Sequence, residues 1–249
     1  MSDHWDFYFC NVDNKIASFF VDLGIRPYVP KTGSDFMVYL QLYLRSPRAD
    51  GLTTGEEFDV LAQVDDEIER DVARDGTMYV GRYTTDGCRT FVFYSGSPSA
   101  SEVAIRSAMA RHPEYNFDIG SRPDADWSLY RDFLYPTPAN MQVIQNRRVY
   151  NSLKDHGDEL ISPREIDHWI YFNDTEDRER FAEVVRQLGF AVRAILEPEG
   201  DQTKRGLQIY RQDTPNPDLF DQVTTQLHEL ARQSGGDYDG WEAAIVKAE

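Results

Sequence analysis

Histidines, acidic pairs and one strand arginine are the residues of this chain whose types and spacing could support chemistry. His4 and His168 each lie beside an aspartate and a tryptophan, yet none of the five histidines has a metal-ligand spacing such as HExxH. Phosphate-binding glycine motifs and the GxSxG sequence of serine hydrolases are also absent. Because a histidine on a strand without such spacing is more often structural, we expect no catalytic residue, no metal site and no cofactor.

The acidic pairs and Arg82 each have a structural and a functional explanation. Pairs such as Asp65-Asp66 occur among 43 acidic residues, and in so acidic a chain they are typical of solvated helix faces. Arg82 lies in the strand-like run Tyr79-Val80-Gly81-Arg82-Tyr83, where its guanidinium could hold an anion among aromatic rings. A salt bridge to a nearby carboxylate is the more common arrangement, so the sequence favours the ion pair and keeps the anion site as the alternative.

The charge of the chain restricts its partners. The 249 residues carry a formal net charge of -17, which repels phosphate backbones, so we expect no direct binding to nucleic acid. The same field favours a basic protein partner, although solubility alone can explain it. No secretory signal is visible, no apolar run reaches the ~18 residues of a membrane span, and the two cysteines lack CxxC spacing. We therefore expect a cytoplasmic protein with reduced cysteines and no membrane association.

The first half of the chain predicts an antiparallel sheet with an additional hairpin at its N-terminus. The predicted strands are 4–10, 15–22, 36–44, 78–84, 89–94 and 115–119. Asp86-Gly87 is a strong hairpin signal between two of them. Capping boxes at 54–57 and 99–102 predict the starts of two helices. From residue 36 onward the order is strand, helix, strand, strand, helix, strand.

The second half repeats that order. Its predicted strands are 166–172, 190–196, 206–211 and 237–246, and helices follow the N-caps Asp174 and Asn216. Two copies of the order predict an α+β protein of two tandem ferredoxin-like antiparallel α/β sandwiches, the first with the extra hairpin. A helix from Pro138 has a weak apolar pattern that suits a connector. We therefore expect domains at 1–136 and 164–249, joined by a helical linker at 137–163.

The face of the second sheet that its helices leave uncovered is the predicted binding surface. In 166–172 the aliphatic residues suit the helix side, and the period of two then turns Trp169 and Tyr171 outward; the same reasoning turns Tyr210 outward. An aromatic patch is seldom left in water, so a partner, the first half or a second copy should cover it. The partner-binding residues that we predict are Trp169, Tyr171, Tyr210, Tyr238, Asp239 and Trp241. Asp239-Gly240 is equally well explained by a β-bulge or turn.

The second half resembles the RraB family of bacterial proteins, which is named for regulating ribonuclease E. The resemblance covers residues 164–249, and its carriers are Tyr238-Asp239-Gly240-Trp241, Leu188-Gly189-Phe190 and Glu197-Pro198-Glu199. It implies a small acidic protein of ferredoxin-like fold that binds the endoribonuclease and lowers its activity without catalysing anything.

The first half is similar to an uncharacterised bacterial family of unknown function. This resemblance covers residues 1–136, and its carriers are Trp5, Asp50-Gly51-Leu52, Tyr79-Val80-Gly81-Arg82 and Phe133-Leu134-Tyr135-Pro136. It implies no activity. Fusion of the two halves suggests a regulatory accessory protein more than an enzyme.

Three hypotheses follow for the whole chain. The leading hypothesis is a non-catalytic regulatory protein that binds a protein partner, such as a basic region of an endoribonuclease of the ribonuclease E type, and inhibits it. The alternative is an enzyme or small-ligand-binding protein with a site between the two domains. The third is a dimeric structural module, since sheets with one open face often pair into a homodimer.

Overall fold

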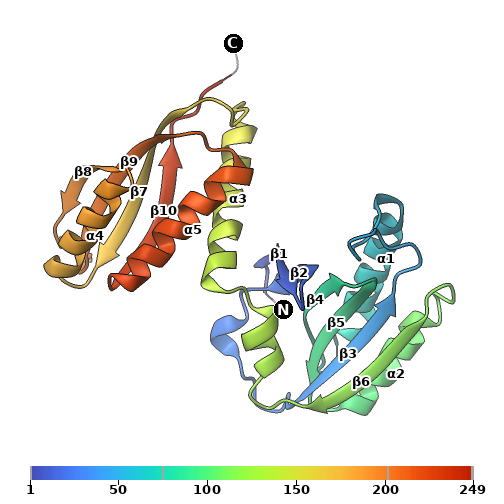
Figure 1. Cartoon of the computed structure of the whole chain (residues 1–249). Coiled ribbons are helices and arrows are strands. Elements are labelled where there is room, and N and C mark those ends of the chain that lie inside the picture. Colours follow the sequence, from blue (N-terminus) through green and yellow to red (C-terminus); the bar gives the residue numbers. More distant parts are fainter. Residues whose placement is uncertain (1, 75, 201, 248–249) are drawn as a thin grey trace. The chain divides into compact units, whose positions relative to one another are not determined.

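The protein consists of two compact units, residues 1–136 and 137–249. A computed structural model describes residues 2–74, 76–200 and 202–247. Figure 1 shows a sheet with helices packed against it in each unit. The predicted fold class, an α+β chain of two tandem antiparallel sandwiches, is confirmed by the two separate sheets.

The first unit is a six-stranded antiparallel sheet with two long helices. Its elements are β1 (Trp5–Val12), β2 (Lys15–Asp22), η1 (Arg26–Tyr28), β3 (Phe36–Tyr43), α1 (Gly55–Val72), β4 (Met78–Thr85), β5 (Cys88–Ser95), α2 (Pro98–Met109), β6 (Phe117–Pro123) and η2 (Leu129–Leu134). The strands lie in the order β1-β2-β4-β5-β3-β6, and every pair is antiparallel. The last four have the ferredoxin-like order, and the β1–β2 hairpin extends the sheet beyond them.

An apolar stripe on α1 forms the core of this unit. Leu61, Val64 and Ile68 recur at helical spacing and pack against buried Phe91 and Phe93 of β5. Several boundaries differ from those predicted, among them those of α2 and β6. Helix α2 begins at Pro98 after Ser97 instead of at the capping box 99–102, because Pro at the first helical position needs no N–H partner. Strand β6 begins at Phe117 and runs to Pro123.

The second unit is a four-stranded antiparallel sheet with three helices. Its elements are α3 (Pro138–Asp155), β7 (Arg164–Phe172), α4 (Thr175–Gln187), β8 (Ala191–Leu196), β9 (Arg205–Asp213), α5 (Pro217–Gln233) and β10 (Gly236–Ala243). The strand order is β10-β7-β9-β8, the ferredoxin-like order, and all pairs are antiparallel. Asp174 and Asn216 cap α4 and α5 through their side chains, as predicted.

Helix α3, which we expected to be a connector, packs within the second unit. Asn146 is buried and makes four hydrogen bonds: its Nδ2 donates to Asp221 and Thr224 of α5, and its Oδ1 accepts from Gln142 and Trp241. The apolar pattern of α3 is weak because polar residues occupy much of its buried face. The helix is therefore held by hydrogen bonds as well as by apolar contacts.

Two further features concern the described part of the chain. None of its helices combines the length and the apolar composition that crossing a bilayer requires. Cys10 and Cys88 are both free thiols.

Candidate functional site

The two faces of the second sheet differ as the period of two predicts. On β7, Ile166, Ile170 and Phe172 are fully buried against the helices, whereas Trp169 and Tyr171 between them are only half-buried. On β9, Leu207 and Ile209 are buried and Tyr210 is half-buried. The predicted facing of both strands is confirmed. We call the side that carries Trp169, Tyr171 and Tyr210 the open face.

Strand pairing places these three aromatic residues along one face of β7 and β9. Tyr210 lies opposite Asp167 of β7, and Tyr171 lies opposite Gly206 of β9. A Cβ on Gly206 would be 2.9 Å from Leu196 Cβ and 3.1 Å from Tyr171 Cε1, so both side chains lie over this glycine. The absence of a side chain at Gly206 therefore lets Tyr171 and Leu196 cover the backbone of β9 at the end of the open face where β7 and β8 end and β9 begins.

A β-bulge in β10 separates the motif Tyr238-Asp239-Gly240-Trp241 into core and surface residues. Tyr238 pairs with Ile170 and Gly240 pairs with Trp169, which leaves Asp239 as the extra residue. Residues three apart on a regular strand face opposite sides, but the bulge turns Tyr238 and Trp241 toward the helices. Both are buried, at 8% and 6% exposure. Of the predicted binding residues, the structure thus places Trp169, Tyr171 and Tyr210 on the open face, leaves Asp239 exposed on β10, and places Tyr238 and Trp241 in the core.

Gly240 leaves space beside Trp169. Its φ is +147°, a conformation that favours glycine, and apart from its two chain neighbours no described residue has an atom within 4 Å of the position a Cβ would take. Strand β10 is at the edge of the sheet, so no other strand of the described residues pairs along its outer side. The indole of Trp169 therefore adjoins an open patch of backbone.

Arg193 of β8 is a residue of the open face that the sequence did not single out. Its guanidinium carbon is 4.1 Å from the centre of the Tyr210 ring, a cation–π arrangement. Its Nη2 donates to Glu165 at 2.6 Å and its Nε donates to Asp167 at 2.5 Å. These hydrogen bonds raise the pKa of Arg193. A bulge between Val192 and Ala194 interrupts the alternation of β8, so no sequence periodicity marked Arg193.

Acidic side chains border the aromatic residues. Glu242 pairs in register with Asp167, and Asp237 pairs with Tyr171 and forms an ion pair with Lys204. Within the described residues, neither Asp239 nor Glu242 has a hydrogen-bond or ion-pair partner. The open face thus combines half-buried aromatic rings with carboxylates that are available to a cation.

His168 is a core residue and takes no part in this surface. It is 0% exposed, and its Nδ1 lies 2.7 Å from the hydroxyl of Tyr238. Burial lowers the pKa of His168 to about 3, so the ring is neutral at physiological pH. No group of three or more His, Cys, Asp or Glu side chains is placed to hold a metal ion in the described ranges.

Comparisons with known proteins divide the chain in the same way as its structure. A family model described as "Family of unknown function (DUF695)" matches residues 3–135, and one described as "Regulator of ribonuclease activity B" matches residues 143–243. No curated protein matches the chain.

One solved structure, titled "Crystal Structure of an Unknown Protein from Galdieria sulphuraria", is similar at 13% identity. The alignment covers 85% of this chain and 99% of that chain, with a TM-score of 0.23, which supports no conclusion about fold or function. Both predicted resemblances are confirmed by the family models: the chain belongs to the family of unknown function DUF695, and its second unit matches the regulators of ribonuclease activity B.

Proposed function

We propose that this protein regulates a ribonuclease, without catalysis of its own, by binding a basic segment of that enzyme on the open face. The observation that carries the proposal is the set of half-buried aromatic side chains, Trp169, Tyr171 and Tyr210, on a sheet face bordered by unpaired carboxylates. The match of the second unit to a regulator of ribonuclease activity supports the identity of the partner. An endoribonuclease of the ribonuclease E type is the partner that we propose, and inhibition is the expected effect.

The contact between Arg193 and Tyr210 shows how a basic side chain fits this surface. The guanidinium lies over the ring while its nitrogens donate to carboxylates on the neighbouring strand. An arginine of the partner can lie in the same way over Trp169, in the space beside Gly240, and pair with Glu242. Aromatic and arginine side chains that meet in this way account for much of the affinity in protein interfaces.

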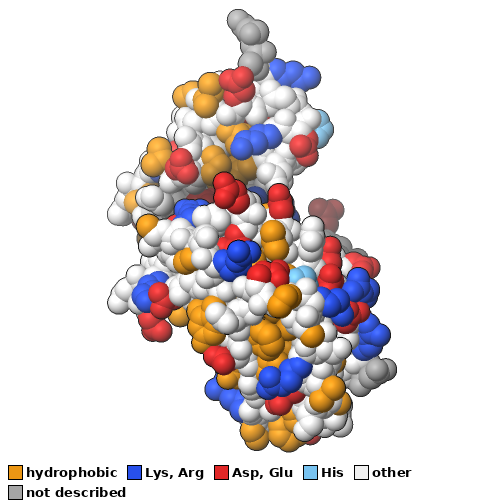
Figure 2. Space-filling view, turned by 90° about the vertical axis from the view of Figure 1, so that its right-hand side faces the viewer, with side chains coloured by type: hydrophobic (Ala, Val, Ile, Leu, Met, Phe, Trp, Pro, Cys, Tyr) orange, Lys and Arg blue, Asp and Glu red, His pale blue; other side chains and the backbone are white. Residues whose placement is uncertain are grey.

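The net charge would speed this association. With a formal charge of -17, the protein attracts a basic segment before contact. Acidic and basic side chains are interspersed on the face that Figure 2 shows. The attraction that we propose comes from the excess of acidic over basic residues. Salt screens such attraction beyond about 10 Å at 0.1 M.

The test is calorimetric titration of the full chain with a purified ribonuclease E type enzyme at 50 and 500 mM salt. We expect affinity to fall at the higher salt concentration. Glu242→Lys should lower affinity about tenfold, roughly 1.4 kcal/mol, because it places a cation beside Trp169. The matched control is Glu179→Lys, which makes the same charge change on the exposed surface of α4.

Two outcomes would count against the proposal. Equal losses of affinity for Glu242→Lys and Glu179→Lys would mean that only net charge is recognised. An affinity that is constant from 50 to 500 mM salt would show that charge attraction does not contribute to binding. A second copy that covers the open face would instead appear as a dimer by light scattering, and Glu242→Lys would shift it toward monomer.

A further inference from the structure

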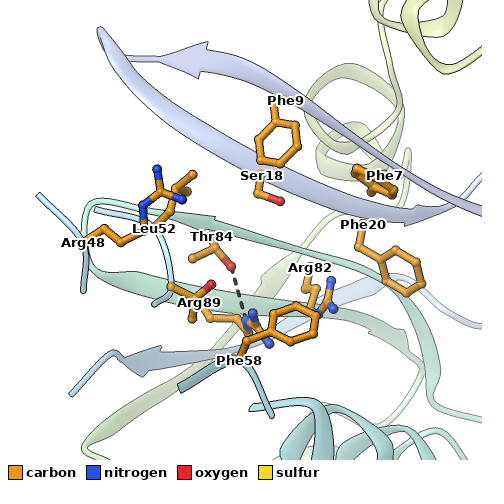
Figure 3. A pocket seen from close by; sticks show the side chains of 11 residues that line it. Phe7, Phe9, Ser18, Phe20, Arg48, Leu52, Phe58, Arg82, Thr84 and Arg89 are labelled. Atoms are coloured by element: carbon orange, nitrogen blue, oxygen red, sulfur yellow. Dashed lines mark hydrogen bonds between the residues drawn. The ribbon is translucent and has the colours of Figure 1, made fainter. Parts of the chain in front are cut away.

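A cavity in the first unit lies between the β1–β2 end of the sheet and the start of α1. Phe7 and Phe9 of β1 pair with Phe20 and Ser18 of β2, and all four face the helix side of the sheet. Phe58 of α1 lies across from them. Together with the loop before α1 these residues line a cavity of about 390 Å³. Figure 3 shows Phe7, Phe9 and Ser18 on one side of it and Phe58, Arg82 and Arg89 on the other.

Three phenylalanines around this cavity are unusually exposed. Phe7, Phe9 and Phe58 keep 42%, 51% and 53% of their surface accessible. Large apolar side chains gathered around one hollow commonly mark a binding site for an apolar group. The edge of the first sheet therefore offers an apolar wall on each side of an accessible cavity.

Two arginines at the base of the cavity share a single carboxylate. Arg82 donates to Asp65 at 2.8 Å, and Arg89 donates to both oxygens of the same carboxylate at 3.0 Å. Arg89 is only 3% exposed, and the side chain of Arg82 is 19% exposed. Two guanidinium groups against one carboxylate leave one positive charge uncompensated in a largely desolvated place.

The donors of the two arginines are not all used. Nη1 of Arg82 and Nη2 of Arg89 have no acceptor among the residues that the structure describes, and both side chains line the cavity. Burial lowers the pKa of Arg89, which reflects the cost of its charge there. Each arginine can therefore hold Asp65 of α1 and still offer one nitrogen to a ligand in the cavity. The ring of Phe20, 4.6 Å from the guanidinium carbon of Arg82, holds that side chain in place.

We propose that this cavity binds an amphipathic carboxylate, with the carboxylate on Arg82 and Arg89 and the hydrocarbon chain between the phenylalanines. Paired guanidinium groups present the forked donors that a carboxylate accepts. At about 30 Å³ for each non-hydrogen atom, the cavity holds roughly a dozen such atoms, which fits a medium-chain fatty acid. The net negative charge of the protein opposes any anion at long range, but contact with two desolvated guanidinium groups outweighs a screened field.

Calorimetric titration of the full chain with sodium decanoate, decan-1-ol and sodium acetate tests each part of the ligand. Decanoate should bind at least tenfold more tightly than decanol, because only decanoate meets the arginines. Acetate should bind at least tenfold more weakly than decanoate, because it lacks the chain. Equal affinity for decanoate and decanol would overturn the role of the arginines, and no binding of decanoate up to millimolar concentration would overturn the site.

Two variants test whether decanoate binds in this cavity. Phe58→Glu puts a carboxylate at the wall of the cavity and should weaken decanoate binding at least tenfold, whereas the control Val60→Glu, on the same helix but outside this cavity, should change it less than twofold. Arg82→Gln keeps Arg89 for Asp65, so the protein should stay folded and lose decanoate affinity at least tenfold. Decanoate affinity that is unchanged in both Phe58→Glu and Arg82→Gln would contradict the proposal.

Discussion

Each unit has one β-bulge at a Tyr-x-Gly-x sequence, but the residue that follows the glycine differs between the two units. Tyr79-Val80-Gly81-Arg82 in β4 and Tyr238-Asp239-Gly240-Trp241 in β10 each pair so that the tyrosine and the fourth residue face the helices. In the first unit the fourth residue is an arginine that ends in a charged cavity. In the second it is a tryptophan that ends in the core. The same backbone device thus serves a ligand site in one unit and packing in the other.

The surroundings of the two bulge glycines explain why only the bulge of β10 leaves open surface beside it. A Cβ on Gly81 would lie 2.7 Å from the carbonyl oxygen of Phe20, because β2 pairs along that side of β4. Gly240 is on an edge strand, where no atom of the other described residues, its two chain neighbours aside, lies within 4 Å of the position of a Cβ. The first glycine permits close strand approach, and the second leaves space beside Trp169.

Removal of Trp241 should have the largest effect. Trp241→Ala empties a site packed against Tyr150 and Phe220 and leaves Asn146 without one hydrogen bond, so we expect a loss of about 3–5 kcal/mol in the second unit. Hydrogen exchange of β7 and β10 amides measures that unit alone. The corresponding change Arg82→Gln removes a surplus charge and should cost less than about 1 kcal/mol in the first unit.

The control for this comparison is Leu219→Ala on the exposed side of α5, which should stay within about 0.5 kcal/mol. A loss below about 1 kcal/mol for Trp241→Ala would contradict the packing role that we assign to the motif.

Acid should destabilise the second unit through His168, the residue that pairs with Trp241 in register. The pKa of His168 is lowered to about 3 in the folded protein, so the unfolded chain takes up the proton first. The stability contributed by the neutral ring is present above about pH 6.5 and is lost as pH falls; by pH 5 the loss is about 2 kcal/mol. In the first unit, the residue opposite Arg82 is Phe91, which cannot titrate.

Exchange of β7 amides from pH 7 to pH 5, corrected for intrinsic rates, measures this loss. The double variant His168→Phe, Tyr238→Phe removes both hydrogen-bonding partners and should flatten the pH dependence. An equal pH slope in the parent protein and the double variant would assign the acid sensitivity to other groups.

The smallest predicted effect is the difference in stability loss between alanine substitutions at the two bulge glycines. Gly81→Ala and Gly240→Ala both strain a backbone at positive φ, but only the first also meets a backbone oxygen. We expect Gly81→Ala to cost on the order of 1 kcal/mol more than Gly240→Ala. Hydrogen exchange in each unit gives both values, and a larger loss for Gly240→Ala would show that the open space beside Trp169 is filled in solution.

Sequence patterns predicted the fold where one face of an element is apolar. The alternation in β7 and the stripe on α1 follow directly from burial of one side, and both are confirmed. The packing of helix α3 was not predicted from its sequence, because polar Gln142 and Asn146 occupy its buried face. A helix held by side-chain hydrogen bonds shows no hydrophobic period, so the sequence predicted a connector instead of a packed helix.

Bulges limited what the sequence could predict about the sites. An inserted residue shifts the period of two, which hid the inward turn of Trp241 and the position of Arg193. For Arg82 the favoured ion pair is present, to Asp65. That Arg89 shares the same carboxylate depends on strand pairing and on the packing of α1, neither of which a single sequence shows.

The most direct test of the central claim is the affinity of the Trp169→Ala variant for a purified ribonuclease E type enzyme, measured beside its melting temperature. We predict at least a tenfold loss of affinity with an unchanged melting temperature, because we propose that Trp169 contacts the partner and because it is only half-buried in the free protein. Tyr28→Ala, which truncates a 77% exposed aromatic residue in the first unit, should change neither quantity. Unchanged affinity, or a drop of several degrees in melting temperature with binding retained, would contradict the claim that the open face binds a partner.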